Sequence, residues 1–466
     1  MSSPTGQHAV NAYLPVPNPT TPYWRTEPHP LDSHGSTKDL PTECDVLIIG
    51  AGISGVSVAY HLSQPDATEA KPTKAPSILL LEARQVCSGA TGRNGGHVKV
   101  KTKTILDAVE KRGGPKLAET VVAFVGAHID AFKDCVERES LDCEFELRRS
   151  YDVYYNEKDA ESLRQSWNKR SIREAPWMRS RQLLDTNLAE AVSGIKGARA
   201  AVSSPACSLW PYKFVTQLLA RTMERNPALN LQTETPVLSV EYLEKGRDSS
   251  PETIVHTPRG SVRAKKVVFA TNGYTAGLLP QYEGVMTPYK GTAAHFAPPP
   301  TKGPVFPHLS HTYNLEFGRH GETVDYLNPR PDGGIVVGGG KYVFEKDRHL
   351  WYNTVDDSTT FDAITDSDYF EGYMQRNFRG WEDSGTEVDK IWTGVMCSTP
   401  DQFPHGGEVP GRKNQWIIAG FNGGGMAMSF LLGKGVAQMV RHDLPFEEID
   451  EIIPRLFKTT EARLAK

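Results

Sequence analysis

Residues 46–55 read Val-Leu-Ile-Ile-Gly-Ala-Gly-Ile-Ser-Gly. Four apolar residues in a row are typical of a buried parallel strand. The glycines that follow are spaced Gly-x-Gly-x-x-Gly, and the apolar residues from Val56 to Leu62 continue with helical spacing. Strand, glycine turn and helix in this order predict an α/β fold with a dinucleotide-binding unit.

Each glycine has a physical task in such a unit. Gly50 permits the tight turn, Gly52 lets the backbone approach a pyrophosphate, and Gly55 allows the helix to pack closely on the strand. The start of the helix offers free N–H groups to an anion. A second apolar strand, residues 78–81, ends in Glu82, where an acid can accept hydrogen bonds from the ribose hydroxyls of an adenine dinucleotide.

The composition narrows the class of partner. The chain has 466 residues, 38% of them apolar, with 52 basic and 56 acidic residues and no long run of either sign. Two or three globular domains are expected, and neither nucleic acid nor a membrane surface is a predicted partner. Small molecules are the expected ligands.

The sequence also bears on where the protein is located and on whether it has a metal site. No apolar stretch approaches the roughly 18 residues of a membrane helix, and the first twenty residues lack the core of a signal peptide. The six cysteines include no C-x-x-C pair, which argues against zinc and against a disulfide framework. A cytoplasmic protein without a metal site is predicted.

The pattern along the chain changes several times. Residues 1–40 are proline-rich and without a period, so we expect a disordered arm with Trp24 and Leu31 as its candidate anchors. Residues 65–76 are predicted to be a surface insertion. A helical period starts at Pro115, and residues 145–155 then alternate as a half-buried antiparallel strand does. Further strands are expected at residues 231–240, 267–270 and 416–419.

A second glycine block follows the first unit. Residues 88–97 read Ser-Gly-Ala-Thr-Gly-Arg-Asn-Gly-Gly-His, a composition that suits close approach of the backbone to a ligand. This block, residues 268–274 and residues 420–426 resemble three sequence blocks of the D-amino-acid-oxidase-like FAD-dependent oxidoreductases. Residues 392–401 and 211–213 are similar to two more. With the first motif, the resemblance covers most of residues 40–445.

The resemblance implies FAD rather than NAD and a discontinuous Rossmann-like fold. The expected FAD-binding domain comprises residues 41–105, 196–285 and 386–466. Residues 106–195 and 286–385 are expected to form an α+β substrate domain on a mixed sheet that covers the flavin, and residues 1–40 an N-terminal arm. Within the family, the chain is most similar to fungal amine oxidoreductases of the γ-glutamylputrescine oxidoreductase type.

The resemblance also implies site residues. His97 and Tyr212 are the predicted catalytic residues. At the C-terminal block, the amides of Gly423, Gly425 and Met426 are expected to face the flavin pyrimidine edge, with tight packing of a small-residue helix as the alternative. The predicted cofactor-binding residues are Gly50, Gly52, Ile53, Ser54, Gly55, Glu82, Ala83, Arg84, Thr91, Gly92, Arg93, Asn94, Gly95, Gly96, His97, Val237, Ala270, Thr271, Asn272, Gly273, Gly420, Asn422, Gly423, Gly424, Gly425 and Met426.

The chain departs from the pattern of family oxidases that act on small N-methyl amino acids. Ala427 stands where those enzymes hold the substrate carboxylate with a lysine, and Val336 where they have an oxygen-activating lysine. Lys290 and Lys341 are candidate substitutes, although exposed lysines commonly serve only solubility. Dioxygen is therefore one candidate electron acceptor among others.

The same comparison with the family pattern bears on whether the flavin is covalently attached. Gly394 stands at the position of a family cysteine that binds flavin covalently, and Cys397 lies too close to Thr399 for that role. His97 is a second attachment candidate, but a histidine after a glycine turn is more commonly a hydrogen-bonding wall residue. Noncovalent FAD is predicted.

Several other residues have two interpretations. Arg149 interrupts an apolar strand face and could anchor an acidic substrate group, or a β-bulge could turn it outward. Four aromatic residues could form the pocket wall or belong to the core. These residues are Trp210, Tyr212, His295 and Tyr326.

The leading functional hypothesis is an FAD-dependent oxidoreductase that oxidises the C–N bond of an amine or amino acid to an imine by hydride transfer to flavin. One alternative is a flavin-binding assembly or scaffold protein without turnover. Another is a biosynthetic flavoenzyme that acts on a specialised amine intermediate. The oligomeric state is left open.

Overall fold

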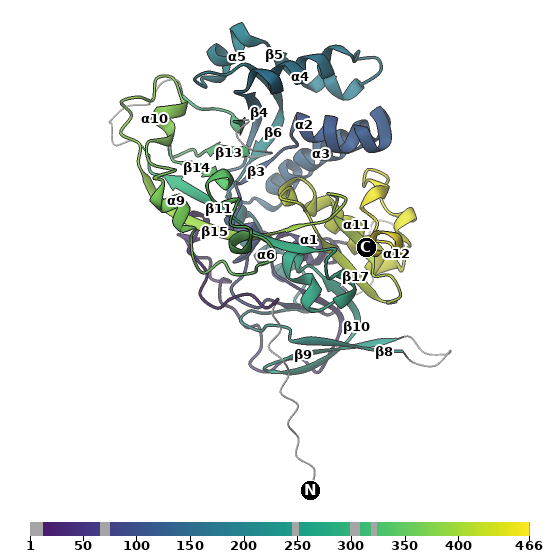
Figure 1. The fold of residues 1–466 in the computed structure, drawn as a ribbon. Coiled ribbons are helices and arrows are strands. Elements are labelled where there is room, and N and C mark those ends of the chain that lie inside the picture. Colours follow the sequence, from purple (N-terminus) through teal and green to yellow (C-terminus); the bar gives the residue numbers. More distant parts are fainter. Residues whose placement is uncertain (1–12, 66–74, 245–250, 299–307, 318–323, 466) are drawn as a thin grey trace.

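A computed structural model describes residues 13–65, 75–244, 251–298, 308–317 and 324–465. Within these ranges the chain forms two sheets, of eight and nine strands, with helices packed on them (Figure 1). This arrangement confirms the predicted α/β class. Most of the predicted insertion, residues 65–76, lies outside the described residues. No helix in the described part of the chain is long and apolar enough to cross a membrane.

The first sheet is built around β1 (Glu43–Ile49), which contains the apolar run that predicted it. β1 lies between β2 (Ile78–Leu81) and β10 (Gly260–Phe269) and is parallel to both. The order across the sheet is β16-β17-β10-β1-β2-β7, with β9 paired to β10 and β8 to β9. The remaining strands are β7 (Leu229–Gln232), β8 (Ser239–Leu243), β9 (Glu252–Thr257), β16 (His405–Glu408) and β17 (Gln415–Ala419).

The second sheet has the order β15-β11-β14-β13-β12-β4-β6-β3, with β5 paired to β6. It is mixed, because β4 (Glu146–Tyr154) is parallel to β12 and antiparallel to β6. The other strands are β3 (His97–Val98), β5 (Gln182–Leu184), β6 (Ala200–Ser208), β11 (Thr287–Phe296), β12 (Thr312–Glu316), β13 (Val324–Pro329), β14 (Ile335–Gly338) and β15 (Val388–Ser398). β3 ends the second glycine block and so joins that block to this sheet.

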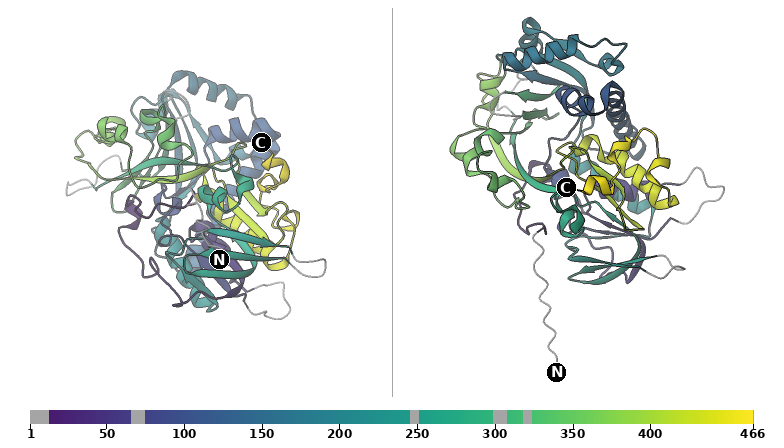
Figure 2. Two further views of the ribbon diagram at one scale, coloured as in Figure 1. Left: turned by 60° about the horizontal axis from the view of Figure 1, so that its bottom comes forward. Right: turned by 45° about the vertical axis from the view of Figure 1, so that its right-hand side comes forward.

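The helices are α1 (Ile53–Leu62), α2 (Thr102–Thr104), α3 (Lys111–Glu139), α4 (Glu157–Asn168), α5 (Thr186–Ser193), α6 (Pro211–Arg225), α7 (Lys341–Phe344), α8 (Arg348–Trp351), α9 (Asp362–Asp366), α10 (Tyr373–Asn377), α11 (Ser429–His442) and α12 (Glu461–Leu464). Apolar side chains of α1, α3, α6 and α11 share one core with β1 and β2. Figure 2 shows the ribbon from two further directions. Helices α7, α9 and α10 pack instead on the second sheet.

Most predicted elements occur near their expected bounds. The helical period from Pro115 belongs to α3, which is kinked at Gly113 and Gly114, so regular helix geometry resumes at the proline. The predicted strand at 231–240 is two strands, β7 and β8. The chain leaves the sheet between them, because the Thr235 N–H binds the Glu82 carbonyl oxygen instead of a neighbouring strand.

The prediction of a disordered arm over residues 1–40 is wrong from Tyr13 onward. Trp24 is fully buried, and its carbonyl oxygen accepts a 2.7 Å hydrogen bond from the indole of Trp210. Leu31 packs against the same core. The segment is fixed by single residues that contact the rest of the molecule. It therefore needs no long helix or strand, and its sequence shows no period. Residues 1–12 lie outside the described part of the chain.

Strand pairing bears on the proposed domain boundaries. β3, β6 and β15 belong to the second sheet, although their residues fall in segments assigned to the FAD-binding domain. β6 is buried along most of its length and β15 at four of its eleven residues, and the composition of such a strand does not reveal which of two sheets it joins. The division into two discontinuous domains stays a proposal, with these three strands moved to the mixed sheet.

Two glycine substitutions test how tightly α1 packs. An added Cβ at Gly55 would lie 1.9 Å from the Gly50 carbonyl oxygen, whereas at Gly126 in α3 it would meet no atom within 4 Å. We expect Gly55→Ala to lower the free energy of unfolding by about 1–3 kcal/mol or more. Gly126→Ala should raise it by about 0.5–1 kcal/mol through helix propensity. Urea unfolding of both variants measures this, and equal midpoints would contradict it.

Candidate active site

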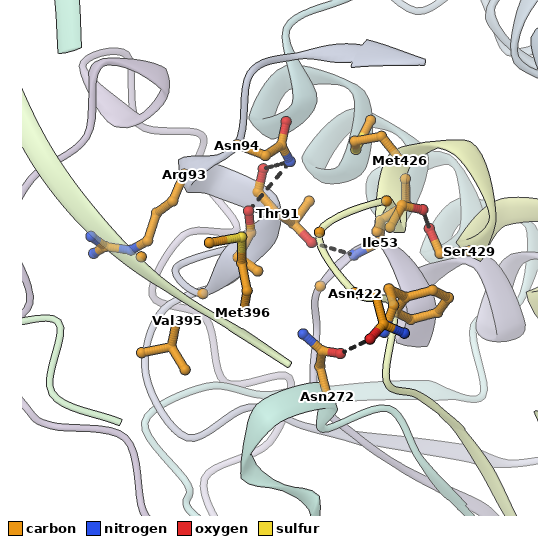
Figure 3. A pocket seen from close by; sticks show the side chains of 18 of the residues that line it. Ile53, Thr91, Arg93, Asn94, Asn272, Val395, Met396, Asn422, Met426 and Ser429 are labelled. Carbon is orange, nitrogen blue, oxygen red and sulfur yellow. Dashed lines mark hydrogen bonds between the residues drawn. The ribbon is translucent and has the colours of Figure 1, made fainter. Parts of the chain in front are cut away.

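A cavity of about 730 Å³ extends from the first glycine turn to the mixed sheet. The turn before α1, the second glycine block and the C-terminal glycine block line one part of it (Figure 3). Residues of β11, β12 and β13 line another part. The cavity therefore joins a dinucleotide-binding turn to a second wall made by a different sheet.

The first turn is held open by hydrogen bonds that leave the helix start facing the cavity. The N–H of Ile53 donates to the Thr91 hydroxyl at 3.1 Å, and no side chain caps α1 at Gly52 (Figure 3). The carboxylate of Glu82 accepts the N–H groups of Ala51 and Arg84 at 2.9 and 3.0 Å. These bonds fix the carboxylate at the edge of the cavity, at the end of β2.

The second glycine block lies against this turn, which it contacts through Thr91. The Asn94 amide donates to the Thr91 carbonyl at 2.9 Å and accepts the Gly96 N–H at 2.7 Å, which fixes the block as a compact loop. Arg93 lines the cavity, but its guanidinium donates to carbonyl oxygens of Ser88 and Thr393 at 2.7 Å each. The side chain of Arg93 thus stabilises the loop, and its predicted cofactor contact is limited to the surface that it adds to the wall.

The C-terminal block is braced by two asparagines with positive φ, Asn272 and Asn422. The Asn272 side chain accepts the Gly420 N–H at 3.0 Å, and the Asn422 side chain accepts the Thr399 N–H at 2.8 Å. The Ser429 hydroxyl binds the Gly425 carbonyl at 2.7 Å (Figure 3). The short helix over Gly425–Ala427 therefore begins at the cavity wall, with its first N–H groups outside the helical bonding pattern.

Most of the predicted cofactor residues line the cavity. They are Gly50, Gly52, Ile53, Ser54, Glu82, Ala83, Arg84, Thr91, Arg93, Asn94, Gly95, His97, Val237, Ala270, Thr271, Asn272, Asn422, Gly423, Gly424, Gly425 and Met426. The others lie behind the wall, where an added Cβ would come within 1.9 to 2.8 Å of a neighbouring atom: Gly55, Gly92, Gly96, Gly273 and Gly420. Those five shape the wall, and direct cofactor contacts are a prediction for the lining set alone.

The structure corrects the role predicted for Tyr212. This residue does not line the cavity; its ring is buried in the core around α6. Its hydroxyl donates to the Asp32 carboxylate at 2.6 Å and accepts the His29 N–H at 2.9 Å. Tyr212 holds the N-terminal segment in place, so it has no access to a substrate and is not catalytic.

The structure decides between the two interpretations of several other residues. Arg149 is exposed, and it points outward without a bulge, since the pairing of β4 with β6 is continuous. Trp210 and His295 belong to the packing around Tyr23 and Trp24, outside the cavity. Tyr326 is the one of the four aromatic candidates that lines the cavity.

Some of the lysine and cysteine candidates line the cavity, and others lie outside it. Ala427, Lys290 and Lys341 line the cavity, whereas Val336 is fully buried outside it. The Nζ atoms of Lys290 and Lys341 lie 4.7 and 4.2 Å from the ring centroids of Phe361 and Trp351. Cys397 is buried away from the cavity, which leaves His97 as the attachment candidate that reaches it.

His97 and Lys99 extend from the second glycine block toward the mixed sheet, and both line the cavity. Burial lowers the pKa of His97 well below its usual value, so its imidazole is neutral at neutral pH, with Nδ1 buried and without a hydrogen-bond partner. Lys99 donates to the Ser150 hydroxyl at 3.0 Å and to the Tyr313 carbonyl at 2.8 Å. Burial lowers the pKa of Lys99 to about 7.

Sequence reasoning missed Lys99 and its neighbours in the wall. Asn314 and Tyr289 also line the cavity, from β12 and β11, and the Tyr289 hydroxyl lies beside Gly423. Strand alternation could have placed Lys99 on the same side as His97, two residues earlier. Asn314 and Tyr289 carry no such signal, because the pairing of distant strands brings them to the cavity.

Comparison with known proteins identifies the family. Residues 45–439 match the DAO family of FAD dependent oxidoreductases. The chain belongs to this family. It is 21% identical over 411 residues to gamma-glutamylputrescine oxidoreductase of Escherichia coli (strain K12), covering 86% of this chain and 84% of that protein.

Two solved structures share the fold of this DAO-family chain. Glycine oxidase from Geobacillus kaustophilus has a TM-score of 0.65 at 19% identity and covers 90% of this chain and 99% of its own. L-proline dehydrogenase from P. horikoshii has a TM-score of 0.66 at 19% identity, with coverages of 90% and 97%. Both likenesses concern the fold.

The residues present fit FAD, the cofactor of the DAO family. The start of α1 lines the cavity and suits a pyrophosphate, and the fixed Glu82 carboxylate suits ribose hydroxyls. The wall between them is glycine-rich, so the backbone itself borders the cavity. Among the described residues, no cluster of three or more His, Cys, Asp or Glu could hold a metal ion.

Removing the Glu82 carboxylate should weaken FAD binding. We expect Glu82→Ala to raise the FAD dissociation constant about 10- to 100-fold, the range for hydrogen bonds that involve a charged group. Fluorescence quenching of FAD on titration with apoprotein measures the constant. Glu241→Ala, at an exposed carboxylate on β8, is the matched control. Equal constants for the two variants would contradict the assignment.

The depressed pKa of Lys99 makes stability depend on pH. Its folded pKa of about 7 lies below the ordinary value of 10.5, so the unfolded chain binds the proton more tightly. This term therefore adds stability as the pH rises from 7 toward 10.5. Lys99→Met lacks the titration, so the stability of the wild type relative to this variant should increase with pH across that window. Urea midpoints at several pH values test this, with exposed Lys116→Met as control, and a flat difference would contradict it.

Proposed function

We propose that this DAO-family oxidoreductase oxidises the C–N bond of an amine that also carries an acid group. The names of its relatives support amine chemistry: gamma-glutamylputrescine oxidoreductase by sequence, and glycine oxidase and L-proline dehydrogenase by fold. The substrate class is inferred from the charge of the cavity wall on the side of the mixed sheet.

That wall presents positive charge. Lys99, Lys101, Lys290 and Lys341 all line the cavity. Among the described residues that line the cavity, Glu82 has the one carboxylate, and this residue belongs to the dinucleotide-binding end. Glu316 binds Lys101 at 3.1 Å and offsets its charge. Lys99, with a pKa of about 7, is not counted as a fixed charge, so the net positive charge of this wall comes from Lys290 and Lys341. A polycationic amine would meet net repulsion here, whereas a carboxylate would be attracted.

When bound, FAD supplies the two-electron acceptor that this oxidation needs. The chain's own task is to bind a neutral amine, because the nitrogen lone pair assists loss of hydride from the adjacent carbon. Lys99 is suited to take the proton from the ammonium form, since its pKa of about 7 lies near ambient pH. His97, neutral and buried, forms a polar part of the wall and adds no charge beside Lys99.

The turn at the C-terminal block has a second task. Its first N–H groups and the Tyr289 hydroxyl beside Gly423 would offer hydrogen-bond donors to bound FAD at this wall. Apolar residues Phe403, Phe421 and Phe457 help to exclude water from the cavity. Water must return afterwards, because hydrolysis of the imine gives the carbonyl product and free amine.

Acceptor and location are part of the proposal. Dioxygen is a candidate acceptor, and no lysine occupies the position of Val336, so another acceptor is equally compatible with the site. The six cysteines are buried free thiols, which agrees with a reducing, cytoplasmic location. A fungal origin rests on the sequence resemblance.

Anaerobic mixing tests the proposed reaction. Holoenzyme is mixed with acidic amino acids, N-alkyl amino acids, neutral monoamines and polyamines, and the visible flavin absorption is followed. We expect bleaching with amines that carry a carboxylate and none with polyamines. Return of the colour in air would identify dioxygen as acceptor. Lys341→Gln should raise KM for an acidic amine more than for a neutral one. Bleaching by polyamines alone would contradict the substrate class.

A further inference from the structure

The segment from Tyr13 to Thr26 touches the cofactor cavity at its beginning. Tyr13, Leu14 and Pro15 line the cavity together with Ala83 and Arg84, which follow Glu82. The Arg84 guanidinium donates to the Val16 carbonyl at 3.2 Å, so the segment is tied to this end of the cavity. A part of the chain far from every glycine motif thus contributes wall at the dinucleotide end.

Thr20 continues the segment behind the second glycine block. The Arg93 guanidinium donates to the Thr20 carbonyl at 2.7 Å and to its hydroxyl at 3.0 Å. The Thr20 hydroxyl also accepts the Thr393 N–H from β15 at 3.1 Å. Thr20 therefore joins the block to the edge of the mixed sheet through one side chain.

Asp357 completes this junction. Its carboxylate, fully buried, accepts both Arg84 nitrogens at 2.9 and 3.2 Å and lies 3.5 Å from the Arg93 guanidinium. Its backbone carbonyl accepts the Thr20 N–H at 2.8 Å. Two arginines that line the cavity, one buried acid and the N-terminal segment thus form one connected network.

Trp24 supports the other end of the same block. Its indole N–H donates to the Asn94 carbonyl, and the ring lies so close to Gly96 that an added Cβ there would be 2.9 Å from it. The ring is fully buried. The block Thr91–His97 is consequently held from behind by Thr20 and by Trp24, while its opposite side borders the cavity.

We propose that residues 13–26 are part of the FAD site: the first three close its dinucleotide end, and Thr20 and Trp24 hold the second glycine block in its binding conformation. A loop fixed in advance loses less conformational freedom when the cofactor binds. Docking of the segment and binding of FAD are then coupled, and each stabilises the other to the same extent.

Substitutions at the junction test this inference through FAD affinity. Thr20→Val removes the hydroxyl and keeps the shape, and Trp24→Phe removes the indole N–H and keeps an aromatic ring. We expect each to raise the FAD dissociation constant at least about fivefold. Thr37→Val is the matched control, because that hydroxyl binds Asn230 and Gln232 on β7 instead of the block. It should change the constant less than about twofold.

Two truncations distinguish the contribution of the three lining residues from that of Thr20 and Trp24. Removal of residues 2–15 takes away the three lining residues, and removal of residues 2–12 leaves them. The longer truncation should weaken FAD binding, and the shorter one should not. No amine enters these measurements, so their failure and a failure of the proposed amine oxidation are distinguishable.

Hydrogen exchange of the wild-type chain gives the reciprocal test without any variant. Added FAD should slow amide exchange within residues 13–26, as mutual coupling requires. Unchanged exchange in this segment would overturn the inference. So would FAD dissociation constants within twofold of wild type for the longer truncation and for whichever of Thr20→Val and Trp24→Phe folds.

Discussion

The carboxylate of Asp357 makes the contact on which the shape of the cavity depends. It comes from the stretch between α8 and α9 and reaches Arg84 after β2 and Arg93 in the second glycine block. Charges in a protein interior are tolerated when they are paired and fully hydrogen-bonded, and this pairing fixes direction as well as distance. Three remote parts of the chain must therefore be in register before the cavity exists.

The two ends of the cavity are built on different principles. Backbone groups make most of the dinucleotide end, where glycines keep side chains away and helix starts present N–H groups. Side chains make the end at the mixed sheet, where Asn314 and Tyr326 come from β12 and β13 and Lys99 directly follows β3. The first end suits a constant ligand, and the second can change with the substrate without disturbing the first.

This difference explains what the sequence could predict. The strand, turn, helix and acid of the first unit follow from local spacing, so β1, α1, β2 and Glu82 were predicted at their observed places. The second and C-terminal blocks needed the family resemblance. Tyr212 was misassigned because a buried tyrosine beside a helix start has the same local sequence whether it faces a ligand or a core.

The remaining site residues depend on contacts that no local pattern encodes. Asn314 reaches the cavity because β12 pairs with β4 about 160 residues earlier in the chain. The N-terminal segment was expected to be disordered because its anchors, Thr20 and Trp24, are isolated polar and aromatic residues among prolines. Their partners lie in the glycine block and in β15, and only the folded chain brings these together.

The order of the first sheet has a consequence for synthesis on the ribosome. β1 emerges early, but its parallel neighbour β10 is translated more than 200 residues later, and β17 later still. Until then, the nascent chain carries an apolar strand with one unpaired edge. Such an edge is open to association with other chains, and so chaperone protection during translation matters more for this topology than for one with sequential strands.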